Sequence, residues 1–437
     1  MSFLPKVTRV IAGVCLAIVP AFLPVRAQTG AGTIRGTVQD ASQAVVPGAK
    51  IRLTNQDTNV TQESTSSAAG IYYFGGLQPG RYQVSVEASG FKRWSGTLLL
   101  AVGQTAAVDV NLEVGSLANT VEVSGASPLI NTETMGVADV KDSLRIHQLP
   151  LNGRDVTNLF NLTPGVEGGG PSPRVNGGKV GSTEILQDGI SQVDRFGGGM
   201  TRVRPGLDTV QEFRIETSGS SAKYAHPATV LLVTKSGTNS LHGSVFETFR
   251  DNAGGLRARQ RQDGNTPAKY IRNEFGASAG GPVFIPKLYN GKDKSFWFFS
   301  YEGMRLRQSY FDQDYVPTAQ MWNGDFSQVV DNSGNRTHIY DPTTTNAQGL
   351  RMPFPGDIIP QSRISPFFGV MKSVTNTPTT ATNPFQDYNL FTFYPLQQNN
   401  DTFTVKGDQK ISDKDSLSGR FTRSRLHVAQ SGGRYGS

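Results

Sequence analysis

The chain has 437 residues, a net charge of +7, and 37% hydrophobic and 18% charged residues. This length allows two to four domains. The low charge and the 49 glycines and 24 prolines argue against a helical cytosolic enzyme and favour an all-β protein with many turns.

The first 27 residues are predicted to be a cleaved signal peptide. Lys6 and Arg9 supply the positive start, and residues 10–19 form an apolar run that is too short to span a bilayer. Val25 and Ala27 are small residues at the positions that a signal peptidase reads, so we expect cleavage after Ala27. The alternative is an uncleaved membrane anchor.

Cleavage would also change the chemistry of the chain. Three basic residues and no acidic ones leave, so the net charge falls to +4, and the single cysteine, Cys15, leaves with them. We therefore expect no disulfide, no thiolate metal site and no cofactor. No later apolar run reaches 18 residues, so any membrane crossing would have to use a closed barrel.

Residues 28–115 alternate short apolar strands with turn residues. Strands are predicted at 33–38, 49–53, 70–74, 80–86, 97–100 and 107–112, a spacing that is typical of a β-sandwich. The stretches GTIRGTVQDASQAVVPGAKIRL (32–53) and GIYYFGGLQPGRYQVSVEASGF (70–91) resemble the carboxypeptidase-regulatory-like domain. The resemblance implies a prealbumin-like sandwich without catalytic residues.

Residues 116–132 are predicted to be a linker. Part of it alternates polar and apolar residues and resembles a TonB box, the segment that a periplasmic energy transducer recruits by adding a strand. The alternative is an ordinary strand or linker, because short alternations are common. The candidate residues are Thr120, Val121, Glu122, Val123 and Ser124.

Residues 133–237 contain the most distinctive sequence motifs. A short helix is predicted at 155–162, ended by Pro164-Gly165, and strands at 185–188, 210–217 and 230–234. The stretches LPLNGRDVTNLFNLTPGV (149–166), RVNGGKVGSTEILQDGI (174–190) and LDTVQEFRIETSGSSAKY (207–224), with the region after residue 230, resemble the plug of TonB-dependent receptors of the Oar-like branch. The resemblance implies an α+β plug.

Residues 238–437 are predicted to be the first part of a transmembrane antiparallel β-barrel. Strands are expected near 241–250, 271–283, 294–306, 402–411 and 416–427. Trp297, Phe299 and Tyr301 alternate with Phe298 and Ser300, as in a strand with one lipid face and one lumen face. The alternative is a soluble sandwich.

The number of predicted strands is small for a plugged barrel, which needs about 22. We therefore expect a truncated chain. The stretch from 310 to 400 is polar and rich in proline and glycine, which favours extracellular loops, with one or two strand pairs inside.

The apparent catalytic motifs lack the structural context that a catalytic site requires. Residues 276–280 match G-x-S-x-G, but Gly281-Pro282 follows instead of a helix, so we interpret the segment as a barrel strand packed close to the plug. His338 and Asp341 resemble half a zinc site in a solvated turn. We expect no enzyme, no metal site and no nucleic-acid site, and we assign the arginine-rich run at 257–261 to a surface loop.

These features predict a mainly β protein of the cell outer membrane. The resemblance implies a TonB-dependent receptor that imports a solute through a plugged barrel. Its expected partners are a TonB-type energy transducer, outer-membrane lipid and an extracellular solute that the sequence does not identify. The alternative is a surface or periplasmic binding or adhesion protein without transport.

Overall fold

A computed structural model describes residues 31–116, 120–123, 137–149, 151, 153–168, 170–194, 196–200, 205–220, 224, 226–252, 269–413 and 415–430. The predicted signal peptide lies outside these residues. The chain divides into two compact units. Unit 1 comprises Met1–Ser244, Ala277–Ser300 and Phe403–Arg423, and unit 2 comprises Val245–Gly276, Tyr301–Thr402 and Ser424–Ser437.

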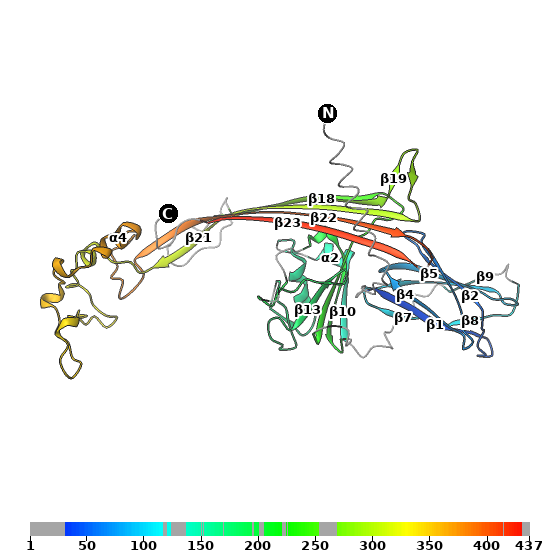
Figure 1. Cartoon of the computed structure of the whole chain (residues 1–437), viewed down its shortest axis with the longest axis horizontal. Helices are drawn as coiled ribbons and strands as arrows, with labels where there is room; N and C mark the ends of the chain where they lie inside the picture. The colour runs from blue at the N-terminus through cyan, green and yellow to red at the C-terminus, as the bar shows by residue number, and fades with distance from the viewer. Residues whose placement is uncertain are drawn as a thin grey trace, which may run out of the picture. The chain divides into compact units, whose positions relative to one another are not determined.

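Unit 1 begins with the predicted β-sandwich. One sheet contains β1 (Gly32–Asp40), β4 (Ile71–Leu77), β7 (Thr105–Ala107) and β8 (Val110–Leu112); the other contains β2 (Lys50–Asn55), β3 (Thr61–Thr65), β5 (Gly80–Glu87), β6 (Arg93–Leu100) and β9 (Thr120–Val123). The first sheet has the order β4-β1-β7, with β8 also paired to β1. The second has the order β3-β2-β5-β6-β9 (Figure 1).

Both sheets contribute alternate residues to one core, because successive side chains of a strand point to opposite faces. Ile34 and Val84 are fully buried there. The Tyr72 hydroxyl donates a hydrogen bond of 2.7 Å to the carbonyl of Val108. Gly36 lies against the same carbonyl, and a Cβ atom at that position would be 1.9 Å from its oxygen, so only glycine fits.

Two details of the sandwich differ from the prediction. β3 was not predicted, because its sequence TQEST is polar and no side chain in it is buried. The predicted strand at 107–112 is two strands, β7 and β8. Asp109 lies between them and accepts hydrogen bonds from the backbone N–H and the hydroxyl of Thr37, at 2.8 and 2.6 Å, which interrupts the ladder.

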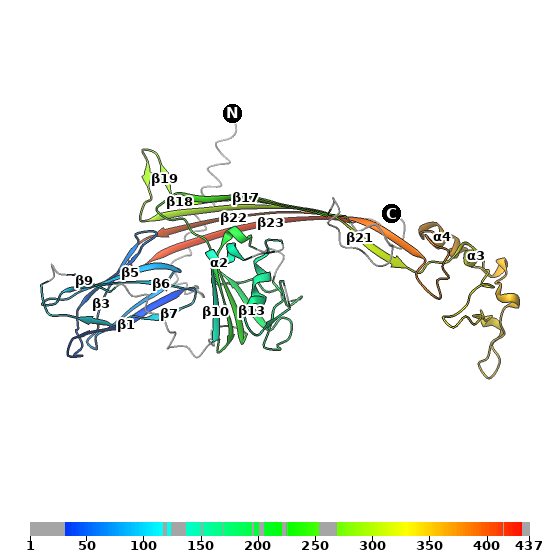
Figure 2. The same ribbon diagram turned by 180° about the vertical axis from the view of Figure 1, so that it is seen from behind.

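The predicted plug folds around a five-stranded sheet, the plug sheet. Its strands are β10 (Val137–Asp142), β13 (Thr183–Gln187), β14 (Ile190–Ser191), β15 (Val210–Ser218) and β16 (Ala228–Thr234), in the order β10-β15-β16-β13-β14. β13 and β16 are parallel, and the other pairs are antiparallel. The strands predicted at 185–188, 210–217 and 230–234 are confirmed, whereas β10 and the helix α2 (Ser143–Gln148) were not predicted (Figure 2).

The centre of the plug sheet is covered on both faces. Every residue of β16 is buried, which explains its continuous apolar run. Val230 and Leu232 pack into the main plug core, and Leu231 and Val233 pack into a smaller cluster on the other face. The predicted helix is a 3₁₀ helix, η1 (Val156–Leu162), whose first turn is capped by the Asp155 side chain.

Five long strands form a meander, which we call the long sheet. Each of the five strands contributes residues to both units. They are β17 (His242–Asp251), β18 (Tyr270–Pro282), β21 (Ser295–Asp314), β22 (Leu390–Lys410) and β23 (Ser416–Gln430), in chain order across the sheet. The hairpin of β19 (Phe284–Ile285) and β20 (Tyr289–Asn290) follows β18 (Figure 1). All five predicted strands are confirmed, and β21 and β22 are much longer than predicted.

The two faces of the long sheet differ as the sequence indicates. In unit 1, Phe298 and Ser300 are buried while Phe299 between them is exposed. Thr404 and Lys406 are likewise buried on either side of Val405, which is exposed. The alternation predicted from the sequence is therefore present in the fold.

Unit 2 contains a folded connection between β21 and β22. The stretch 310–400 includes one strand pair, as predicted, because residues 310–314 belong to β21 and residues 390–400 to its neighbour β22. The connection contains α3 (Ala319–Trp322), η3 (Pro342–Thr344), η4 (Pro355–Asp357), η5 (Gln361–Arg363) and α4 (Pro366–Val374), with isolated bridges only. Among the described residues, no helix is long and apolar enough to cross a membrane. Ion pairs and aromatic contacts hold this segment together; for example, the tilted rings of Trp322 and Phe368 have centroids 4.5 Å apart.

Candidate functional site

The TonB-box candidate lies at the edge of the sandwich. Residues Thr120–Val123 form β9, which pairs in parallel with β6. The register places Thr120 opposite Arg93 and Val123 opposite Gly96. Ser124, the last candidate residue, lies outside the described residues. The segment predicted as a linker thus includes a strand of the sandwich.

A turn of the sandwich docks on the plug sheet within unit 1. Val102, at the tip of this turn, is fully buried and packs against Leu186, Leu231 and Val233. Its backbone N–H donates a hydrogen bond to a carboxylate oxygen of Glu212 on β15. The contact therefore combines an apolar tip with one hydrogen bond to a buried carboxyl group.

Glu212 is the titratable group of this contact. Its pKa is raised to about 7, mainly by burial and also by the nearby Asp142, although the Val102 hydrogen bond and Arg214 act in the opposite direction. A carboxyl group with a pKa near neutrality changes charge under ordinary conditions. The sandwich and the plug sheet are therefore joined through a pH-sensitive residue.

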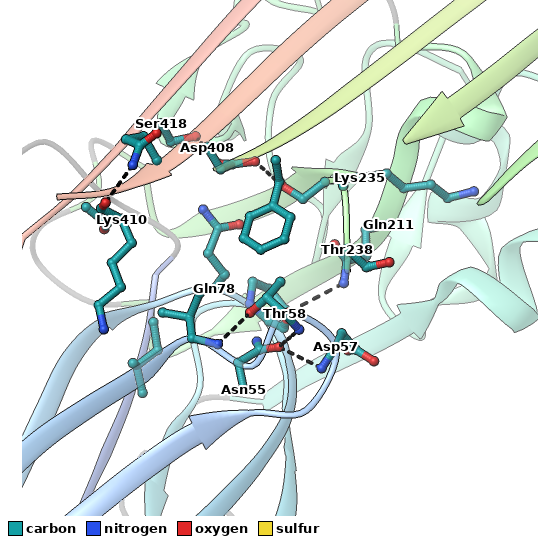
Figure 3. A pocket seen from close by; sticks show the side chains of 18 of the residues that line it. Asn55, Asp57, Thr58, Gln78, Gln211, Lys235, Thr238, Asp408, Lys410 and Ser418 are labelled. Atoms are coloured by element: carbon teal, nitrogen blue, oxygen red, sulfur yellow. Dashed lines mark hydrogen bonds between the residues drawn. The ribbon is translucent and has the colours of Figure 1, made fainter. Parts of the chain in front are cut away.

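A cavity of about 320 Å³ lies elsewhere in unit 1. Figure 3 shows that its walls come from the sandwich, from the plug sheet and its flanks, and from the long sheet. Acidic and basic side chains both line it, which argues against a site for one sign of charge. The labelled lining residues are Asn55, Asp57, Thr58, Gln78, Gln211, Lys235, Thr238, Asp408, Lys410 and Ser418.

Hydrogen bonds across the cavity tie the sandwich to the other parts of unit 1. The Asn239 side chain donates to the carbonyl of Thr58 at 2.8 Å. Lys410 Nζ at the end of β22 donates to the carbonyl of Thr61 at 2.7 Å. Most acceptors are backbone carbonyls, so the arrangement is suited to holding chain segments together.

Charged groups also connect the plug sheet to the long sheet. Arg420 Nε on β23 lies 2.7 Å from Oδ2 of Asp188, which follows β13. Asp188 also accepts hydrogen bonds from the N–H and hydroxyl of Thr234, at 2.9 and 2.6 Å. Lys406 Nζ on β22 is buried and donates to the Thr234 carbonyl at 3.0 Å. These four residues form the plug latch.

A second buried cluster surrounds Asp208, which precedes β15. Arg154 Nη2 donates to its Oδ2 at 2.6 Å, and the Ser244 hydroxyl donates to its Oδ1 at 3.3 Å. His147 Nε2 lies 3.6 Å from the same carboxylate and 3.3 Å from Lys235 Nζ. Burial lowers the pKa of both His147 and Lys235, and the nearby Asp208 partly offsets this effect.

The residues suspected of chemistry are not brought together. Ser278 lies inside β18, where its hydroxyl is 2.8 Å from that of Ser244, so it does not stand on a strand-to-helix turn. His338 Nδ1 is 3.1 Å from Asp357, whereas Asp341 pairs with Arg363. In the part of the chain that the structure describes, no three His, Cys, Asp or Glu residues gather as metal ligands.

Sequence reasoning missed the residues that make these contacts. Asp188 and Arg420 are 232 positions apart, and only the folded chain brings them together. Glu212 looks like an ordinary polar residue of a half-buried strand. The only available signals were the polar residues on the inward face of β22 and β23, including Lys406 and Arg420.

Comparison with known proteins agrees with this arrangement. Residues 33–113 match the family described as carboxypeptidase regulatory-like domain, and residues 233–436 match the outer membrane beta barrel domain. The chain is 31% identical over 287 residues to the TonB-dependent transporter Oar of Myxococcus xanthus. The chain is therefore similar in sequence to an Oar-type TonB-dependent transporter. It is a mainly β protein of the cell outer membrane.

The matched region of this Oar-like chain is partial. It covers 61% of the chain but only 26% of the Myxococcus protein. Among solved structures, the siderophore receptor PirA of Acinetobacter baumannii is similar over 70% of this chain and 34% of its own, with 14% identity and a TM-score of 0.37. The catechol 1,2-dioxygenase of Acinetobacter radioresistens is similar over 22% and 57%, with 14% identity and a TM-score of 0.18.

Proposed function

We propose that the chain is part of an outer-membrane receptor that binds a solute and imports it through a plugged barrel, powered by a TonB-type transducer. The observation that supports this most directly is the plug latch. In this latch, the plug sheet is bound to the long sheet by the buried ion pair of Asp188 with Arg420 and by the hydrogen bond from the buried Lys406 to Thr234. Polar fastenings of this kind can open and close again without unfolding either part.

We assign the parts of the chain accordingly. Residues 1–27 are an export signal, 28–115 the sandwich, 116–132 a linker with the TonB box, 133–237 the plug, and 238–437 the first part of the barrel. The transducer adds a strand to residues 120–124 and pulls, and the plug moves. The chain acts through binding and rearrangement, without bond chemistry, so we do not assign it an enzymatic activity.

The sequence relationship supports this role, since the Myxococcus relative is named a TonB-dependent transporter. The rival function is adhesion or binding at the surface without transport, in which case the transducer would have no part. The interaction with the transducer therefore separates the two.

The test uses the purified periplasmic domain of the TonB-type transducer from the same genome. Substituting Val121→Pro and Val123→Pro removes two backbone N–H donors from the segment, and we expect binding to the full chain in detergent to fall by tenfold or more (about 1.4 kcal/mol). The control is Val114→Pro, at an exposed position of the preceding segment. Absence of transducer binding by the unchanged chain would favour adhesion without transport, and equal binding by all three chains would remove the TonB-box assignment.

A further inference from the structure

Two successive segments of the chain pair with residues 90–96. Residues 113–115 run antiparallel to residues 90–92, which directly precede β6: the Lys92 N–H donates to the Glu113 carbonyl at 2.8 Å, and the Gly115 N–H donates to the Gly90 carbonyl at 3.1 Å. Residues Thr120–Val123 then run parallel to Arg93–Gly96. The chain direction therefore reverses between residues 115 and 120.

Because of this reversal, β9 is not a simple continuation of the segment 113–115 along the same edge. A chain leaving residue 115 along the edge would run away from β6, and a parallel strand forms only if the chain turns back. The β6 backbone is thus a binding site for an extended segment, and its occupant is the TonB-box candidate. β9 is the outermost strand of its sheet (Figure 1).

The pairing of β9 with β6 is short, because its register covers four residues of each strand. It engages the first half of β6 only. Leu99, in the second half, is exposed, and the described residues place no further strand beside that half. A four-residue parallel pairing is stable enough to be formed and weak enough to be exchanged.

We propose that the sandwich stores the TonB box on the edge of β6, and that the transducer recruits it by strand exchange. This inference rests on the proposed function. The transducer reads the backbone of an extended segment, and the backbone of residues 120–123 is engaged with β6. The sandwich therefore competes with the transducer, and the exchange rate sets how often the plug is pulled.

The test locks the stored state with a disulfide. In a Cys15→Ala background, which removes the single cysteine, Arg93→Cys and Thr120→Cys place two thiols at paired positions. The matched control is Lys50→Cys with Thr65→Cys, an antiparallel pair on β2 and β3 at the opposite edge of the same sheet. Full-length chains are compared in detergent, oxidised and reduced, for binding of the transducer's periplasmic domain.

We expect the oxidised Arg93/Thr120 chain to bind at least tenfold more weakly than its reduced form, and the control pair to bind equally in both states. Addition of the transducer strand to the outer edge of β9, with β6 still paired, predicts equal binding by the oxidised and reduced chains and would overturn the proposal. Failure of the Arg93/Thr120 pair to oxidise under conditions that close the control pair would also overturn it, because the register requires proximity.

A synthetic peptide of residues 116–130 separates this inference from the proposed function. The peptide carries the segment without β6, so it should bind the transducer domain whether or not storage occurs. Peptide binding together with an unaffected crosslinked chain removes the storage proposal and keeps the TonB box. Absence of peptide binding removes the TonB-box assignment, and the storage proposal falls with it.

Discussion

Arg420 and Asp188 join the long sheet to the plug sheet through a contact of 2.7 Å between Nε and Oδ2. Both side chains are largely buried, at 12% and 20% exposure. The geometry is that of an ion pair and not of an aligned hydrogen bond, since Arg420 Nε has no hydrogen-bond partner. The attraction is therefore mainly electrostatic, and neutralising one partner leaves the other charge buried.

We expect Asp188→Asn or Arg420→Gln alone to destabilise the plug by about 3 kcal/mol, the usual cost of leaving a buried charge unpaired. The double variant should cost less than the sum of the two single variants. Urea-dependent hydrogen exchange of β13 and β16 in detergent measures the effect. Additive costs would show that the two side chains act independently.

Glu212 predicts a pH dependence of the contact between the sandwich and the plug sheet. Its folded pKa, about 7, lies above the ordinary value of 4.5, so the docked state binds a proton more tightly than the undocked state. The contribution to docking is therefore complete at low pH and is lost as the pH rises from 4.5 through 7. The size of the effect is on the order of 3 kcal/mol.

Protection of the Val102 amide from hydrogen exchange, measured from pH 5 to pH 8, tests this expectation after correction for intrinsic exchange rates. Protection should fall with rising pH in the unchanged chain and should be nearly flat in Glu212→Gln. The control is Glu63→Gln, at an exposed residue of β3 that pairs with Arg52. The same pH profile in Glu212→Gln and the unchanged chain would contradict the assignment.

Gly103 tests the apolar side of the same contact. Its φ of +62° favours glycine, and a Cβ atom there would lie 2.7 Å from Cδ1 of Leu231 on the plug sheet. Gly90 has a φ of +85° with open space around its Cβ position. Gly103→Ala and Gly90→Ala therefore share a backbone cost of about 1–2 kcal/mol, and only Gly103→Ala adds a clash.

We expect Gly103→Ala to weaken docking of the sandwich on the plug sheet and Gly90→Ala to leave docking unchanged. Hydrogen exchange of the Val102 amide reports docking, because its N–H donates to Glu212 across the contact. Equal protection in the two variants would show that the Leu231 contact does not hold the sandwich in place.

Phe421 tests the lipid-facing side of the long sheet. It is 60% exposed on β23 and its ring lies 6.1 Å from that of Phe403 on the neighbouring strand. An arginine on a lipid face costs about 2–4 kcal/mol near the bilayer midplane. We expect Phe421→Arg to reduce recovery in the outer-membrane fraction, with Phe421→Leu as the apolar control. Equal recovery of both variants would place this residue outside the lipid.

The strands were predictable where the alternation of apolar residues is local. Val84 and Val86 alternate with polar residues, and Val405 lies between the polar Thr404 and Lys406. The faces of these strands could therefore be predicted directly from the sequence. β3 could not be read in this way, because its residues are polar on both faces. The 3₁₀ turns between β21 and β22 were not predicted for a related reason. They depend on capping residues such as Asp341, whose side chain also pairs with the distant Arg363.

The candidate site was predictable only in part. The alternation at 120–124 identified a segment suited to strand pairing, but not that β6 is its partner. Glu212 could not be recognised, because its raised pKa depends on burial beneath the Val102 turn. Contacts between residues more than 100 positions apart leave no mark in a single sequence.

The turn at Val102 gives a tensile load two routes from residues 120–123 into the plug. One follows the covalent backbone to β10. The other crosses the β6 ladder into the sandwich and reaches β15 through Val102 and Glu212. While the ladder is intact, the sandwich shares the force, and once it opens the whole force falls on the backbone at β10. Under the proposed pulling by a transducer, the β6 ladder would therefore set the force at which the load reaches the plug through its own backbone.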